Sequence, residues 1–136
     1  MKQLIFLLSC AGFLLAGESN SGADGDKIEG NRGYRDYWVV KVDASGTKVW
    51  DKTFGGAAED RCYGVVANPD GTFLLTGESE SGAEGDKSES SRGNSDYWAV
   101  KIDASGSKVW DKRFGGSSND IVNVASATSD GGYLLT

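Results

Sequence analysis

Apolar and polar residues alternate along short segments of the chain with a period of two, which is typical of β-strands. In residues 96–103, Trp98, Val100 and Ile102 fall on one face of such a strand, and the intervening residues fall on the other. Turn signals separate the segments, with Asp-Gly at positions 70–71 and Asp-Ala-Ser-Gly at 103–106. The pattern contains no helical period and predicts four short strands in one unit, at residues 61–69, 72–79, 96–103 and 107–115.

The same pattern occurs twice along the chain. Residues 17–76 align with residues 77–136 without a gap, at an offset of 60 positions, and 36 of the 60 aligned residues are identical. Tandem repeats of this kind are typical of solenoids, propellers and other arrays. The sequence therefore predicts a signal-peptide-like segment at residues 1–16, a first repeat at 17–76 and a second repeat at 77–136.

Four antiparallel strands in each repeat predict the blades of a β-propeller. A β-sandwich is the alternative fold, but a sandwich does not need two nearly identical units. A propeller closes with about 4–8 blades, and a repeat array needs about three or more units for stability. We therefore expect an all-β fold of tandem four-stranded antiparallel blades that forms an incomplete, open propeller. The expected partners are further repeats of a longer chain or other copies of this chain.

Two stretches carry a family resemblance, "DYWAVKIDASGSKVWDKRFGG" at residues 96–116 and "DGGYLLT" at 130–136. Their pattern resembles the tandem β-propeller repeats of bacterial secreted and cell-surface proteins, and the resemblance extends over residues 12–136. In the Bacteroidetes such proteins often carry a C-terminal type 9 secretion sorting domain, which these 136 residues lack. The resemblance implies an exported protein whose repeats act as a scaffold or bind a protein or a glycan.

The first residues allow two interpretations. A positive charge at Lys2 precedes an apolar run at residues 4–16, which is typical of a secretory signal peptide. Within it, Leu-Leu-Ser-Cys at 7–10 resembles a bacterial lipobox, in which Cys10 carries the lipid. In the second interpretation Met1 lies inside a longer repeat protein, because residues 12–19 align with the strand at 72–79. We expect a secreted or cell-surface protein without a transmembrane span, because the run is shorter than the ~20 residues that a spanning helix needs.

Composition narrows the possible partners and chemistry. The net charge of −6 argues against nucleic acid, because binding to phosphates needs a basic surface. The chain contains no histidine, so the commonest general base and the commonest transition-metal ligand are absent. Its two cysteines, Cys10 and Cys62, set no disulfide framework. Cys62 aligns with Val122, which predicts a small apolar side chain on a buried strand face.

The strongest candidate for a binding site is the long connection between the second and third strands of each repeat. Loops of this length are often functional. The connection is rich in glycine and carboxylates, and Ca²⁺ takes about 6–8 oxygen ligands. The candidate calcium ligands are Asp24, Asp26, Glu29 and Asp36 in the first repeat and Glu84, Asp86, Glu89 and Asp96 in the second. In the alternative interpretation the loops are solvated, and Arg32 and Arg92 pair with nearby acids.

Aromatic residues at equivalent positions of the two repeats are expected to form a structural core. They are Trp38, Trp50 and Phe54 in the first repeat and Trp98, Trp110 and Phe114 in the second. The alternative is a glycan-binding face, because aromatic rings stack on sugars. We expect no catalytic residues, because a catalytic site is normally single whereas these features recur. The alternatives to a non-catalytic scaffold or binding module are a glycan hydrolase that uses the loop carboxylates as acid and base, and a truncated fragment without a function of its own.

Overall fold

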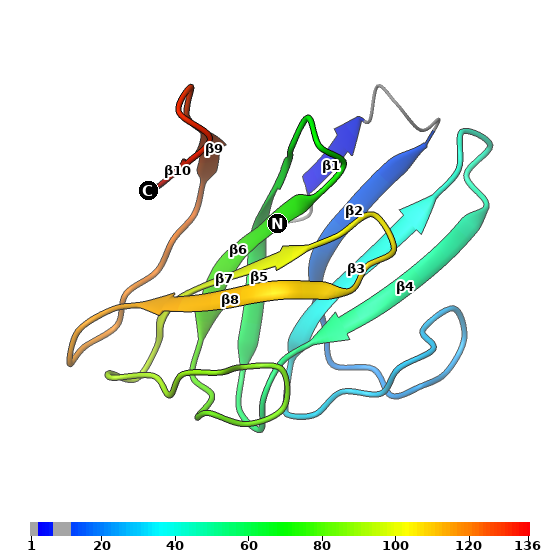
Figure 1. Ribbon diagram of the computed structural model, residues 1–136. Coiled ribbons are helices and arrows are strands. Elements are labelled where there is room, and N and C mark those ends of the chain that lie inside the picture. The colour runs from blue at the N-terminus through cyan, green and yellow to red at the C-terminus, as the bar shows by residue number, and fades with distance from the viewer. Residues whose placement is uncertain (1–2, 7–11) are drawn as a thin grey trace.

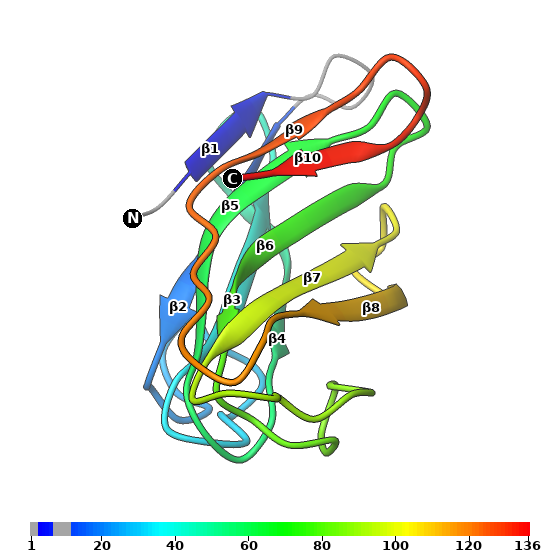
Figure 2. The same ribbon diagram turned by 90° about the vertical axis from the view of Figure 1, so that its left-hand side faces the viewer.

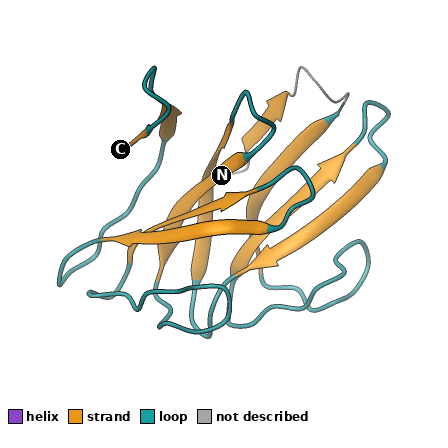
Figure 3. Cartoon of the chain, viewed as in Figure 1, coloured by secondary structure: helices purple, strands orange, loops and turns teal. Residues whose placement is uncertain are grey.

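The computed structural model describes residues 3–6 and 12–136. These residues form β-strands and no helix, which confirms the all-β prediction (Figures 1 and 3). The first sheet has the order β1-β2-β3-β4, the second sheet has the order β5-β6-β7-β8, and a third sheet pairs β9 with β10, all antiparallel. The strands are Gln3–Phe6 (β1), Phe13–Ser19 (β2), Asp36–Val42 (β3), Lys48–Phe54 (β4), Asp60–Ala67 (β5), Phe73–Ser79 (β6), Asp96–Ile102 (β7), Lys108–Phe114 (β8), Ala125–Ala127 (β9) and Tyr133–Leu135 (β10).

The second to fourth strands of the two larger sheets share one register. Gly17 pairs with Trp38 in the first sheet, and Gly77 pairs with Trp98 at the equivalent place in the second sheet. Both sheets also carry a register shift at the end of their third strand. The duplication in the sequence is therefore a duplication of structure.

The hairpin turns follow from the Asp-Ala-Ser-Gly sequence. In the β3–β4 turn, the Asp43 carboxylate accepts hydrogen bonds from the backbone N–H groups of Ser45 and Thr47, each at 2.9 Å. Gly46 closes the turn with a φ of 86°, in the left-handed region that favours glycine. The β7–β8 turn repeats this geometry, with a φ of 85° at Gly106. Local hydrogen bonding therefore fixes both hairpins.

One face of the first sheet packs against one face of the second sheet, and the hydrophobic core lies between them (Figure 2). At its centre, the rings of Tyr37 and Trp98 have centroids 4.8 Å apart and are tilted by 52°. The Tyr37 hydroxyl donates a hydrogen bond of 2.8 Å to the backbone oxygen of Trp98. This contact between the sheets is termed the internal joint. Its buried apolar side chains are Leu14, Ala16, Tyr37, Val39 and Phe54 from the first sheet and Cys62, Val65, Phe73, Leu75, Trp98, Val100 and Ile102 from the second.

The six aromatic residues expected in the core differ in burial. Trp98 and Phe54 face the internal joint and are buried. Trp38, Trp50 and Trp110 are half-buried, while Phe114 is 52% exposed and lies outside the core. Trp38 and Phe114 are less buried because they lie on the two sheet faces that point away from the internal joint.

Part of the N-terminal interpretation falls on residues that the structure does not describe. Residues 1–2 and 7–11, and with them Cys10 of the lipobox prediction, lie outside the described residues. Among the described residues, no helix is long and apolar enough to cross a membrane. Cys62 is 1% exposed in the core, which confirms the predicted buried position, and burial raises the pKa of its thiol to about 12.

The internal joint predicts unequal effects of one substitution in the two repeats. We expect Tyr37→Phe to lower the free energy of unfolding by about 1–2 kcal/mol, because it removes a buried hydrogen bond. Tyr97→Phe is the matched control, because Tyr97 holds the equivalent place on an open face, and we expect a change within about 0.5 kcal/mol. Urea denaturation of both variants measures the difference. Equal losses in the two variants would contradict this account.

Candidate functional site

Two long loops, at residues 20–35 and 80–95, connect β2 to β3 and β6 to β7 at the same end of the sheets (Figure 1). Each loop closes around a buried lysine. Lys27 donates to the side-chain oxygen of Asn31 at 2.9 Å, and Lys87 donates to the backbone oxygen of Ser81 at 2.9 Å. Burial lowers the pKa of both lysines. Sequence reasoning missed them, although the Gly-Asp-Lys triplet stands at the same place in both repeats.

A buried aspartate closes each loop. The Asp36 carboxylate accepts hydrogen bonds from the backbone N–H groups of Arg32 at 2.7 Å and Gly33 at 3.4 Å. Burial raises the pKa of Asp36, and these two hydrogen bonds oppose the rise. Asp96 accepts the equivalent pair of hydrogen bonds in the second loop. The loop ends are therefore held by groups that sequence analysis had assigned to calcium.

Another acid, Asp86, connects the second loop to the first sheet. Its carboxylate accepts a hydrogen bond of 3.1 Å from the N–H of Gly55 and lies 3.1 Å from the Nε of Arg32. Burial raises the pKa of Asp86, although the Gly55 N–H and the Arg32 guanidinium both act to lower it. The predicted pairing of Arg32 with a nearby acid is thus present, across the internal joint. Two of the remaining acids accept hydrogen bonds from backbone N–H groups, Glu29 from Thr53 and Glu84 from Ala57. Glu89 forms an ion pair with Arg113, and Asp24 and Asp26 are exposed.

The eight candidate calcium ligands do not converge on one point. Within residues 3–6 and 12–136, no group of three or more acidic or cysteine side chains is placed to share a metal ion. Six of the eight carboxylates are bound to backbone N–H groups or to cations. Because Ca²⁺ needs about 6–8 oxygen ligands, this arrangement does not fit a calcium centre.

A groove of about 300 Å³ lies on the open face of the first sheet. It combines the apolar face of β2 and β3 with charged residues at its rim, as ligand-binding clefts do. This surface is termed the Trp38 groove. Its lining consists of Leu15, Ala16, Gly17, Trp38, Val40, Val42 and Gly46, with Glu18, Asp26 and Lys48.

The indole of Trp38 is held in place by Asp51. Its Nε1 donates a hydrogen bond of 3.1 Å to Asp51, which also accepts from the N–H of Ile28 and from Lys48, both at 3.0 Å. Burial favours a higher pKa for Asp51, but the hydrogen bonds outweigh burial, and the pKa lies below its ordinary value. The motif Lys-Val-Trp-Asp-Lys in both repeats was the signal for this aspartate, which sequence reasoning missed.

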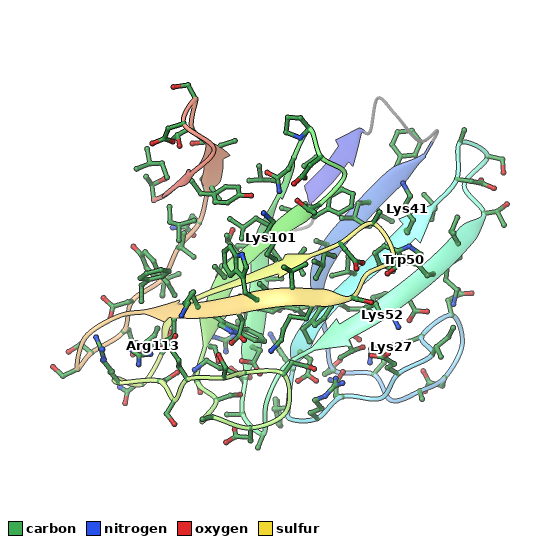
Figure 4. The ribbon with its side chains drawn as sticks, in the orientation of Figure 1. Lys27, Lys41, Trp50, Lys52, Lys101 and Arg113 are labelled. Carbon is green, nitrogen blue, oxygen red and sulfur yellow. The ribbon has the colours of Figure 1, made fainter. Side chains whose placement is uncertain are left out.

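The Trp38 groove has a filled counterpart in the second repeat. There the equivalent face, with Gly77 and Trp98, receives Tyr37 of the first sheet. From β4, Trp50 and Lys52 lie beside the turn between β7 and β8 (Figure 4). The same sequence pattern therefore forms an interface in one repeat and an open groove in the other.

Comparison with protein-family models and with curated proteins finds no match to this chain.

Stability should rise as the solution is made mildly acidic. Asp60 is buried at the start of β5, and burial raises its pKa from 3.8 to about 6. The folded chain therefore binds this proton more tightly than the unfolded chain, so stability increases as the pH falls from 7 toward 4 and is lost as the pH rises through 6. The effect approaches about 3 kcal/mol at most.

Denaturation at several pH values measures this dependence in the native chain and in one variant. Asp60→Asn should flatten the curve between pH 4 and 7, because its amide cannot ionise. An unaltered pH dependence in Asp60→Asn would refute the assignment.

Calcium should not stabilise the chain. Because the loop carboxylates are engaged elsewhere and do not converge, we expect the same Tm in calcium chloride and in a chelator. Differential scanning calorimetry provides the comparison. The opposite result is a Tm that calcium raises in the native chain and no longer raises when Asp26 and Asp86 are both replaced by Asn.

Proposed function

We propose that this chain is a non-catalytic β-propeller repeat segment of an exported protein and acts as a scaffold or binding module. The internal joint is the observation that carries the proposal. It places two consecutive four-stranded sheets face to face, and the second to fourth strands of the two sheets share one register. The strand β5 also contacts β1 of the first sheet and β9 of the third, so the first strands of successive sheets lie next to one another. This arrangement supports blades that surround a common axis.

The chemistry of the faces supports a propagating array. Each repeat carries a tyrosine on one face of its third strand and a tryptophan on the other, as in Tyr37 and Trp38. At the internal joint, the tyrosine face of the first repeat meets the tryptophan face of the second. Because the second repeat has the same two faces, the same contact can be made again. Such repetition is the property expected of a scaffold.

The engagement of the loop carboxylates supports a non-catalytic role. A general acid or base must reach the substrate, whereas Asp36 and Asp96 are fully buried and hydrogen-bonded to the backbone.

The Trp38 groove is the surface that best suits binding, because it is concave and apolar with a charged rim. Export of the protein is inferred from the resemblance to secreted repeats.

A charge exchange across the internal joint tests the proposal. We expect Arg32→Asp and Asp86→Arg each to lower the free energy of unfolding by about 1 kcal/mol, because each places like charges together at a partly exposed site. The double variant restores opposite charges and should recover at least half of the combined loss. Denaturation should also unfold both sheets in one transition. Additive losses with separate transitions would mean that the two repeats do not stack as blades.

A further inference from the structure

We infer that copies of this chain associate head to tail, with the Trp38 groove of one copy covered by the open tyrosine face of another. That face, termed the Tyr97 face, consists of Tyr97 and Phe114 on paired strands together with Arg92 of the adjoining loop. The inference rests on the proposed function, because it uses the stacking of repeats as its template. It adds a defined partner, a second copy, and a defined pair of surfaces.

The internal joint supplies the template for this association. In it, Tyr37 lies on Trp98, Phe54 is only 5% exposed, and Arg32 lies 3.1 Å from Asp86. These contacts come from β3, β4 and the loop at residues 20–35 on one side. On the other side they come from β7 and the loop at residues 80–95. Each side chain that makes these contacts has an identical counterpart 60 positions away in the sequence. The counterparts are Tyr97, Phe114, Arg92, Trp38 and Asp26.

The Trp38 groove repeats the receiving side of the template. It contains Trp38 in the place of Trp98, and Gly17 in the place of Gly77. A Cβ atom at Gly77 would lie 1.9 Å from the backbone oxygen of Arg61 on the neighbouring strand and 2.8 Å from the Tyr37 hydroxyl. A glycine at this place therefore allows both the neighbouring strand and a phenol ring to approach. Gly17 lines the Trp38 groove, and the internal joint shows that a tyrosine side chain fits beside a glycine at this place.

The Tyr97 face repeats the inserted side of the template. Phe114 takes the place of Phe54, yet it is 52% exposed, whereas Phe54 is 5% exposed. Tyr97 pairs with Phe114 across β7 and β8 as Tyr37 pairs with Phe54 across β3 and β4. A large exposed aromatic side chain on a sheet face is typical of an interaction surface.

The charges of the two surfaces are complementary. Within the described part of the chain, neither the Asp26 carboxylate nor the Arg92 guanidinium forms an ion pair. Their counterparts Asp86 and Arg32 pair with each other across the internal joint. An acid at the rim of the groove and a base beside the Tyr97 face would pair when a second copy docks. Complementary charges of this kind select a partner and set its orientation.

The hairpin β9–β10 limits the strength of this association. It contacts β5 on the side of the second sheet opposite to β1 and β2, so it takes part of the space that an incoming copy would need (Figure 1). The β7–β8 half of the second sheet stays open, and this half carries the Tyr97 face. An incoming copy must therefore displace the hairpin or share the space with it. We expect the association to be weaker than the internal joint for this reason.

The contact is heterologous, because the two surfaces are different patches of the chain. Each copy has one of each surface, so association continues until a ring closes or a fibre forms. A symmetric dimer through a single patch is a different arrangement, and the two can be distinguished. Reversing the charge of one surface on one copy and of the other surface on a second copy leaves opposite charges only at contacts between the unlike copies.

The test is the solution mass of the chain and of three variants, measured by sedimentation equilibrium from about 1 μM to about 1 mM, the range of modest protein interfaces. The native chain should exceed its monomer mass of 14.4 kDa as concentration rises. Asp26→Arg and Arg92→Asp should each weaken association about tenfold or more, because each places like charges together. The double variant should associate again. Both positions are exposed, so the variants should keep the native circular dichroism.

Mixing the two single variants gives the sharpest outcome. The mixture should associate more strongly than either variant alone, because both contacts between unlike variants, the unaltered pair and the exchanged pair, bring opposite charges together. A native chain that stays monomeric at every concentration would overturn the inference, as would equal association in all variants. The exchange of Arg32 and Asp86 is the separate test of repeat stacking. If that exchange shows coupling and the native chain is monomeric, the proposed function stands and this inference fails.

Discussion

The packing of Tyr37 on Trp98 is the contact on which the rest of the structure depends. A single sheet of four strands has two apolar faces and cannot bury either of them alone. The ring contact, with its buried hydrogen bond of 2.8 Å, joins two such sheets and encloses the core between them. Gly77 leaves room for this contact, because a Cβ atom there would meet both the Arg61 backbone oxygen and the Tyr37 hydroxyl. The ion pair of Arg32 with Asp86 closes the same contact at its rim. The stacking of the two sheets therefore follows from this contact.

Identical residues have different environments in the two repeats because one face of each four-stranded sheet lies in the internal joint and the other face does not. Trp98 is fully buried, whereas Trp38 lines a groove, and Phe54 is buried, whereas Phe114 is exposed. Nothing in the local sequence distinguishes the members of each pair. The difference comes from which face meets another sheet. The open faces are therefore best understood as halves of an interface already present once in the molecule. The proposed association between copies would therefore have the same chemical origin as the stability of the chain.

The sequence was sufficient for the strands, the turns and the duplication, because these depend on local patterns. Alternation at 96–103 placed β7, and the Asp-Ala-Ser-Gly turns placed both hairpins. The site was harder to predict. The carboxylates at Asp36, Asp86 and Asp96 were interpreted as metal ligands, whereas they hold loop ends and the joint between repeats. Composition indicates oxygen ligands but not their partners, which depend on contacts between distant segments. The roles of Lys27 and Asp51 were missed for the same reason, although both recur at the same place in each repeat.

The central claim is that the two repeats stack through Tyr37 and Trp98, and the most direct measurement is the nuclear Overhauser effect between these two rings in a dilute sample. Ring centroids 4.8 Å apart place protons of the two side chains close enough for strong cross-peaks. The account predicts cross-peaks between Tyr37 and Trp98. It predicts none within the same molecule between Tyr97 and Trp38, which lie on opposite outer faces. Absence of the first set, with the two sheets tumbling independently, would contradict the account.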